Sequence, residues 1–176
     1  ITHIATIFAC ILIVCLFALA ASDGALRLFG APIIFLCAGV SFVVHWAIAI
    51  PALITKTEKY FDLTGMIATL LIVVTAMIAL FTSEQQVSII SSIVAVFVSI
   101  WTLRLGTFLY IRIVKSGEDK RFREIKNSYP KFLMTWTLSA LWVFLTTVNA
   151  ITVVVINPVK PLGLFFIIGV SLWIFG

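Results

Sequence analysis

The charged residues that interrupt apolar runs are the first candidates for chemistry in this chain. Arg104 lies in such a run, near the start of WTLRLGTFLYIRIVKSGEDKRF, residues 101–122. A charge inside a membrane span is costly and is usually paired or functional. We expect a functional role for Arg104, the alternative being an anchor whose side chain extends to the membrane interface. If the helix persists, Arg104, Phe108 and Lys115 share one face, with Trp101 one turn earlier.

A second group of polar residues precedes another apolar run, in TEKYFDLTG, residues 57–65. Glu58, Tyr60 and Asp62 are of types that donate or accept protons in enzymes. Asp62 together with Thr64 could instead cap the helix that begins there, because a carboxylate suits a helix N-terminus. Capping and an acid–base or substrate-binding role both remain open for this group.

Further polar side chains lie deeper in the apolar runs. His45 and Trp46 fall within HWAIAIP, and Asn149 lies in a later run, where we expect it to form a hydrogen bond between helices. For His45, the alternatives are a neutral ring bonded to a carbonyl and a ligand-binding or proton-transfer role. The only other histidine is His3, so no metal site is expected. We expect small buried apolar side chains, rather than disulfides, at the three cysteines, Cys10, Cys15 and Cys37.

The elements that position these residues follow from composition. The chain of 176 residues is 62% hydrophobic and 11% charged, and its mean hydropathy is +1.23. A soluble domain of this size cannot bury that much apolar surface, whereas segments of about 20 residues can span a bilayer as helices. The sequence therefore predicts an all-α, polytopic transmembrane helix bundle that forms a single domain over residues 1–176. The expected spans, about six, are residues 4–21, 32–55, 63–82, 87–113, 132–156 and 161–176.

Basic residues are distributed asymmetrically. The loops after the second and fourth expected spans carry nine of the twelve Lys and Arg residues, and residues 112–131 alone have a net charge of +4. Because an excess of Lys and Arg marks the cytoplasmic side, we expect loops 56–62 and 112–131 to be cytoplasmic. A bacterial inner membrane and the endoplasmic reticulum both fit. Residues 112–131 could contact anionic lipid headgroups or bind a phosphorylated ligand; nucleic-acid binding is not expected.

The sequence has no Walker-type loop, GxGxxG, GxSxG or HExxH motif. Three blocks nevertheless carry a family resemblance: EKYFDLTG, WTLRLGTFLYIRIVKSGEDKRFREIK and YPKFLMTWTLSALWVFLT. In this order and spacing, between about Lys56 and Thr147, they resemble the uncharacterised-function branch of the steroid 5-alpha-reductase superfamily. Members of that superfamily are integral membrane proteins related to steroid and sterol reductases.

The resemblance implies NADPH-dependent reduction of a carbon–carbon double bond in an apolar substrate such as a steroid, sterol or other isoprenoid. It also implies that an acidic or phenolic group supplies the balancing proton. The candidate site residues then divide into three groups. Candidates for catalysis are Glu58, Tyr60 and Asp62; for cofactor binding, Arg104, Arg112 and Arg121 near the cytoplasmic mouth; and for the substrate pocket, His45, Trp46, Trp101 and Asn149.

Two departures from the superfamily pattern matter. The resemblance leads us to expect a His-Pro-Asn-Tyr-like cofactor motif after the sixth span, but the sequence stops first, at LWIFG. It also leads us to expect Gln-Gly at the position of Ser139-Ala140. We therefore expect either that the natural polypeptide continues beyond Gly176, with most of the NADPH site there, or that this is a non-catalytic membrane subunit that packs in a larger complex. An isoprenoid-modifying methyltransferase of similar build is a third alternative.

Overall fold

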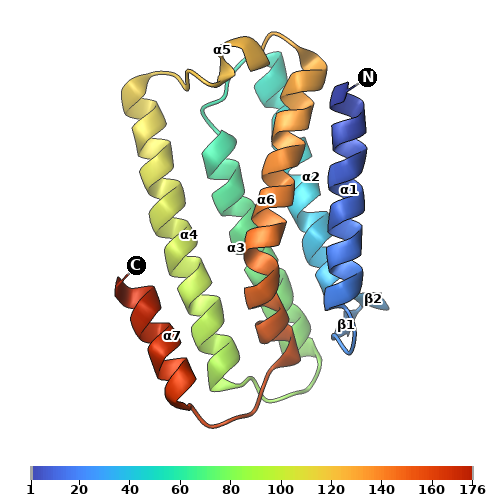
Figure 1. The fold of residues 1–176 in the computed structure, drawn as a ribbon, viewed down its shortest axis with the longest axis vertical. Helices are drawn as coiled ribbons and strands as arrows, with labels where there is room; N and C mark the ends of the chain where they lie inside the picture. Colours follow the sequence, from blue (N-terminus) through green and yellow to red (C-terminus); the bar gives the residue numbers. More distant parts are fainter. Residues whose placement is uncertain (1, 176) are drawn as a thin grey trace.

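The protein forms an elongated bundle of roughly antiparallel helices, as seen in a computed structural model that describes residues 2–175 (Figure 1). Its secondary structure is almost entirely helical, apart from one two-stranded hairpin. The predicted all-α class is therefore confirmed. In chain order the elements are α1 (Thr2–Ala21), β1 (Arg27–Leu28), β2 (Ala31–Pro32), α2 (Ile33–Ile54), α3 (Phe61–Thr82), α4 (Ile89–Ser116), α5 (Phe122–Ile125), α6 (Tyr129–Ile156) and α7 (Leu164–Phe175).

Within residues 2–175, five helices are long and apolar enough to cross a membrane: α1, α2, α3, α4 and α6. Each has 20 to 28 residues, which at 1.5 Å per residue spans the ~30 Å of a bilayer core. The chain is accordingly an integral membrane protein. The sixth expected span is represented by α7, whose 12 residues extend about 18 Å. It lies beside α4, and the rings of Phe97 and Trp173 stack with centroids 4.2 Å apart.

The helix α6 is the centre of the bundle, because it contacts α1, α2, α3 and α4 (Figure 1). Its most buried residues include Trp136, Ala140 and Phe144, which face neighbouring helices rather than the surroundings. On α4 the buried residues are mostly small, among them Ala95, Thr102 and Gly106. Small side chains at helix contacts let two backbones approach closely, which is the common way for helices to associate in a membrane.

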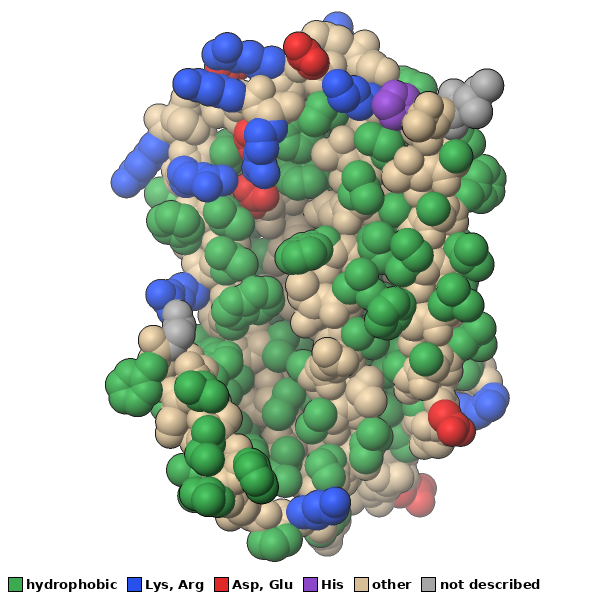
Figure 2. Space-filling model, in the orientation of Figure 1, with side chains coloured by type: hydrophobic (Ala, Val, Ile, Leu, Met, Phe, Trp, Pro, Cys, Tyr) green, Lys and Arg blue, Asp and Glu red, His purple; other side chains and the backbone are tan. Residues whose placement is uncertain are grey.

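The two ends of the bundle differ in character. At one end the α2–α3 loop meets the connection between α4 and α6, which contains α5; at the other end lie the β1–β2 hairpin and the α6–α7 connection (Figure 1). Most of the charged side chains in the view of Figure 2 gather at the α5 end. The two loops with the largest share of basic residues therefore share one end of the protein.

Some local features were not predicted from the sequence. Residues 27–32 pair as a short hairpin whose turn places Phe29 and Gly30 in the left-handed region, with φ of 52° and 79°. The end of α6 is also specific: Asn157 adopts φ 51°, and its side chain accepts a hydrogen bond from the Ser88 backbone N–H and donates one to the Gln86 carbonyl, both at 2.8 Å. Asn157 thus joins α6 to the start of α4.

The cysteines behave as predicted in that none forms a disulfide; Cys10 and Cys37 are buried and Cys15 is partly buried.

Candidate functional site

A cavity of about 480 Å³ lies between α3, α4 and α6, and its volume is within the range of pockets that hold small-molecule ligands. On α6 its lining extends from Thr135 to Thr146, a rise of about 16 Å. Leu105 and Trp101 of α4 and Trp142 of α6 line it and are also exposed on the outside of the bundle. The cavity therefore opens sideways between α4 and α6, where the surface is hollowed (Figure 2).

Two glycines shape the walls of this cavity. At Gly106 of α4, a β-carbon would lie 2.5 Å from the Met66 β-carbon, so α3 and α4 approach closely there only because this residue has no side chain. Gly65 of α3 faces α6, where a β-carbon would lie 3.5 Å from a methyl group of Val143. The close α3–α4 contact narrows the cavity on that side, and the exposed lining residues Trp101 and Trp142 lie on the α4–α6 side, where the cavity opens.

An aromatic cluster closes the cavity at the α5 end. Phe122 of α5 is 2% exposed and packs edge-on against Phe61 of α3, with ring centroids 4.9 Å apart. Phe61 in turn meets Trp136 of α6 at 5.3 Å, and Phe132 packs against the same group. Burial of Phe122 anchors an otherwise polar connection to the bundle, and it holds the adjacent Arg121 at the rim of the cavity.

Ionisable groups gather at this rim. Asp62, in the first turn of α3, and Arg121 both line the cavity, and the Asp62 carboxylate lies 3.8 Å from the guanidinium of Arg112 on α4. The Asp62 side chain is largely buried, whereas half of the Arg112 side chain is exposed. The largely apolar cavity thus has one carboxylate and two guanidinium groups at the end nearest α5.

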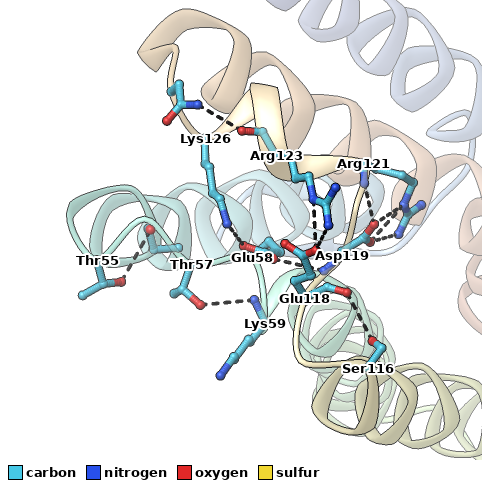
Figure 3. Close-up of polar contacts among 12 residues, drawn as sticks. Thr55, Thr57, Glu58, Lys59, Ser116, Glu118, Asp119, Arg121, Arg123 and Lys126 are labelled. Atoms are coloured by element: carbon cyan, nitrogen blue, oxygen red, sulfur yellow. Dashed lines mark hydrogen bonds and ion pairs between the residues drawn. The ribbon is translucent and has the colours of Figure 1, made fainter.

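A second ionic group ties the loops above the rim together (Figure 3). Glu58 of the α2–α3 loop is buried; its carboxylate accepts a hydrogen bond of 3.0 Å from the Asp119 backbone N–H and lies 3.3 Å from Nζ of Lys126. The α2–α3 loop and the α4–α6 connection are therefore held by one carboxylate.

Within the α4–α6 connection, Asp119 binds Arg121 through both the guanidinium and the backbone N–H, and Glu118 binds Arg123 (Figure 3). The hydrogen bond from Arg121 lowers the pKa of Asp119 below its ordinary value, and that from Arg123 lowers the pKa of Glu118. Both carboxylates are consequently ionised at neutral pH, and they neutralise part of the positive charge predicted for this segment.

His45 is fully buried in α2 and does not line the cavity, but it is linked to it by a hydrogen bond with Ser139. Its Nδ1 is 2.7 Å from the Ser41 carbonyl oxygen, and its Nε2 is 3.2 Å from Oγ of Ser139, which lines the cavity. The neighbouring Trp46 donates its indole N–H to Thr137 Oγ1 at 3.0 Å. Both residues therefore connect α2 to α6, and of the two expected states for His45, the structure shows the ring bonded to a carbonyl.

The structure separates the sequence-predicted site residues into different places. Asp62, Arg121 and Trp101 line the cavity, and Arg112 adjoins its rim. Glu58, His45 and Trp46 lie behind its walls or above its rim, and Tyr60 is exposed. Arg104 lies on the outer surface of α4, on the same exposed face as Phe108 and Lys115, as the helical spacing predicted, but away from the cavity lining.

One of the two alternatives left open for Asp62 is not observed, and the expectation for Asn149 is wrong. Asp62 does not cap α3: the capping position is Tyr60, with no side-chain hydrogen bond, and Thr64 donates its hydroxyl to the Tyr60 carbonyl instead. Asn149 is exposed on α6 and forms no side-chain hydrogen bond with residues 2–175, since it lies on the outward side of that helix. Asn157, eight residues later, forms the bonds between helices.

Sequence reasoning also missed residues that matter to the cavity. Ser139 and Thr102 are small polar residues in long apolar helices, which is ordinary in a membrane, and Gly106 lies two residues from the more conspicuous Arg104. The available signal was spacing: Thr102 and Gly106 stand four apart, the separation that places small residues on one packed face.

The bundle and its laterally open cavity define the class: an integral membrane protein with a ligand-sized cavity that an apolar molecule could enter from the bilayer. Residues 45–176, three quarters of the chain, match the family described as "Protein of unknown function (DUF1295)". The chain belongs to this family. Comparison with curated proteins and with solved structures finds no match.

Proposed function

We propose that this protein is a membrane reductase that uses NADPH to reduce a carbon–carbon double bond in a steroid- or isoprenoid-like lipid. The observation that carries the proposal is the cavity between α3, α4 and α6, which is mostly apolar, opens sideways, and has Asp62, Arg112 and Arg121 at one end. An apolar lipid fits the long lined part, and a charged cofactor fits the ionic rim. The resemblance to the steroid 5-alpha-reductase superfamily supplies the reaction class.

The residues at the rim are of the types that hold a dinucleotide phosphate. Guanidinium groups bind phosphate through two parallel hydrogen bonds, and Arg112 is half-exposed with only a 3.8 Å contact to Asp62. Arg121 is bound to Asp119, so its use would require that pair to rearrange. Lys115 and Lys120 add exposed positive charge on the same connection. Arg112 is therefore the first candidate to hold phosphate.

NADPH, when bound, would supply the hydride. The protein's own part is to orient the lipid, exclude water and provide a proton. Of the three predicted proton donors, Asp62 is the one that lines the cavity, whereas Glu58 is already bonded to Asp119 and Lys126 and Tyr60 points outward as an exposed residue. We assign the proton-donating role to Asp62, which would act in its protonated form, and the carboxylate left after the transfer would be stabilised by Arg112 and Arg121.

The proposed function requires the α5 end of the bundle to face the cytoplasm. NADPH is a cytosolic cofactor, and the basic α5 end is the end that the positive-inside rule directs to the cytoplasm. The exposed lysines and arginines there would also contact anionic lipid headgroups, each adding about 1 kcal/mol near the surface. Either a bacterial inner membrane or the endoplasmic reticulum satisfies these conditions.

Binding of NADPH provides the first test. Purified protein in lipid nanodiscs should show saturable energy transfer from tryptophan to NADPH, and Arg112→Gln should weaken binding roughly 10-fold or more, because a charged hydrogen bond is lost. Lys160→Gln, at the opposite end, is the matched control and should bind as the wild type does. Absence of saturable binding to the wild type, or equal weakening by both variants, would contradict the proposal.

One observation favours the alternative of a non-catalytic subunit. Arg104 and Asn149 are exposed on spanning helices, and neither has a side-chain ion pair or hydrogen bond within the described part of the chain. Polar groups facing lipid are costly, so a partner helix could satisfy them. Co-purification of a stable membrane complex that is lost in Arg104→Leu, together with no NADPH binding, would support this second function.

A further inference from the structure

The surrounding groups determine which residue is the donor in the hydrogen bond between His45 and Ser139. His45 Nδ1 faces the Ser41 carbonyl oxygen at 2.7 Å, and a carbonyl only accepts, so Nδ1 must carry a hydrogen. In a neutral imidazole, Nε2 is then the acceptor. The Ser139 hydroxyl, 3.2 Å away, donates its hydrogen to that nitrogen. Ser139 therefore has its hydrogen committed to α2, and its oxygen lone pairs remain.

The other hydroxyl groups of the cavity lining have their hydrogens committed as well, with one exception. Thr69, Thr135 and Thr146 donate to carbonyls of their own helices, those of Gly65, Lys131 and Trp142, at 2.8 to 3.0 Å. The exception is Thr102 of α4, which is 3% exposed, lines the cavity and forms no side-chain hydrogen bond with any described residue. Away from the rim, the lining thus offers hydroxyl acceptors, one free hydroxyl donor, and the indole N–H groups of Trp101 and Trp142 as further donors.

Counting donors and acceptors distinguishes between ligand groups. A ligand hydroxyl both donates and accepts, so it can donate to an acceptor such as Ser139 and can accept from Thr102. A ligand ketone or ether only accepts, and it leaves Ser139 unused. Ser139 differs from the other hydroxyl acceptors because its own hydrogen goes to an imidazole on a second helix, which fixes the position of its oxygen.

We propose that Ser139, positioned by His45, is the hydrogen-bond acceptor that binds the hydroxyl group of an apolar ligand inside the cavity. The ligand class is a long apolar molecule with a single hydroxyl, and a matching molecule that lacks a hydrogen-bond donor binds more weakly. This inference rests on the proposed use of the cavity as a lipid site, and it specifies which end of the lipid is recognised and by which atom.

The test uses two photoreactive probes with the same alkyl chain, a long-chain alcohol that carries an alkyl diazirine and its methyl ether. Purified protein in nanodiscs is irradiated with each probe below saturation and without NADPH, and labelled peptides of α3, α4 and α6 are quantified by mass spectrometry. In the wild type the alcohol should label the cavity about 5-fold more than the ether, the effect of one typical hydrogen bond. In Ser139→Ala the ratio should fall to about 1.

Two further variants separate binding from folding. Thr135→Val removes a lining hydroxyl that is bonded to its own helix, and it should keep the wild-type ratio. Ser139→Thr keeps the hydroxyl and should keep most of the preference. Labelling by the ether reports an intact cavity, so a Ser139→Ala protein with normal ether labelling is folded. An equal ratio in wild type and Ser139→Ala, or no preference for the alcohol in the wild type, would overturn the proposal.

Failure of this inference is distinguishable from failure of the reductase proposal. An alcohol preference that depends on Ser139, in a protein that does not bind NADPH, would leave the hydroxyl site standing and remove the reductase function. NADPH binding without any alcohol preference would leave the reductase function standing and remove the hydroxyl site.

Discussion

Glu58 is expected to hold the α4–α6 connection closed over the cavity, and its replacement gives the most quantitative test of the structure. The Glu58 carboxylate accepts the Asp119 backbone N–H at 3.0 Å and lies 3.3 Å from Lys126 Nζ. In Glu58→Ala, a partly buried N–H loses its partner, at a cost of about 1–3 kcal/mol. The ion pair adds at most about 1 kcal/mol, because a quarter of the Lys126 side chain is exposed. We therefore expect a loss of about 1–4 kcal/mol.

Hydrogen exchange in nanodiscs measures this loss directly. Peptides that cover residues 117–128 should exchange roughly 30-fold faster in Glu58→Ala for a loss of about 2 kcal/mol in opening free energy. Glu58→Gln keeps an acceptor for the Asp119 N–H and removes only the charge, so its effect should be about 1 kcal/mol or less. Lys59→Ala, at an exposed neighbour, is the control and should exchange at the wild-type rate.

The comparison of the two Glu58 variants shows whether the backbone hydrogen bond or the ion pair holds the α4–α6 connection. If Glu58→Gln accelerated exchange as much as Glu58→Ala, the ion pair rather than the backbone hydrogen bond would hold the connection. If neither variant changed exchange, the contact drawn in Figure 3 would not close the cavity at all.

Three further predictions follow from contacts elsewhere. Gly106→Ala should lower the free energy of unfolding by about 1–3 kcal/mol in thermal or denaturant unfolding, because its β-carbon would meet Met66 at 2.5 Å, whereas Gly39→Ala, with no atom within 4 Å, should not destabilise the protein. Asn157→Ala should cost about 1–3 kcal/mol in the same assay, since the Ser88 N–H and the Gln86 carbonyl lose their partner. Because the pKa of Asp119 is lowered in the folded protein, its stabilisation of residues 117–128 should be complete above its ordinary pKa of 3.8 and be lost as pH falls below that value. Hydrogen exchange corrected for intrinsic rates should show this loss in the wild type and not in Asp119→Asn.

Each of these has a result that would contradict it. Equal stability of Gly106→Ala and the wild type would mean that α3 and α4 are further apart than the structure shows. An Asn157→Gly variant keeps the left-handed backbone but lacks the side chain; if it were as stable as the wild type, the side-chain bonds would contribute nothing. An acid-induced loss of protection that persists in Asp119→Asn would assign the titration to another carboxylate.

The sequence was sufficient for the features that depend on composition and length. Apolar runs long enough to span a bilayer have few alternatives to helix, so the spanning helices and the shared end of the two basic loops could be predicted. Asp62 and Arg121 could be named as site candidates because charge is rare in this chain. A uniformly apolar segment does not indicate, however, how its helix is rotated about its own axis, and this rotation determines which side chains face a cavity.

The failures of prediction share that cause. Arg104 and Asn149 were candidates for the cofactor and substrate site because they are polar, but the rotation of α4 and α6 directs them away from the cavity. Ser139 was named only as a departure from the superfamily pattern, although the rotation of α6 brings it to both His45 and the cavity. Asn157 required knowledge that α6 ends in a left-handed residue, which is a property of the turn and not of the apolar run.

The most direct measurement of the central claim is transfer of deuterium from NADPH to a lipid. Wild-type protein in nanodiscs is incubated with NADPH deuterated at the transferable position of the nicotinamide and with a lipid extract of membranes, and lipids are analysed by mass spectrometry. We expect a lipid that gains deuterium and loses one double bond, in reduced yield with Asp62→Asn and in undiminished yield with Lys160→Gln. Binding of NADPH without deuterium in any lipid, or equal yield with Asp62→Asn, would contradict this expectation.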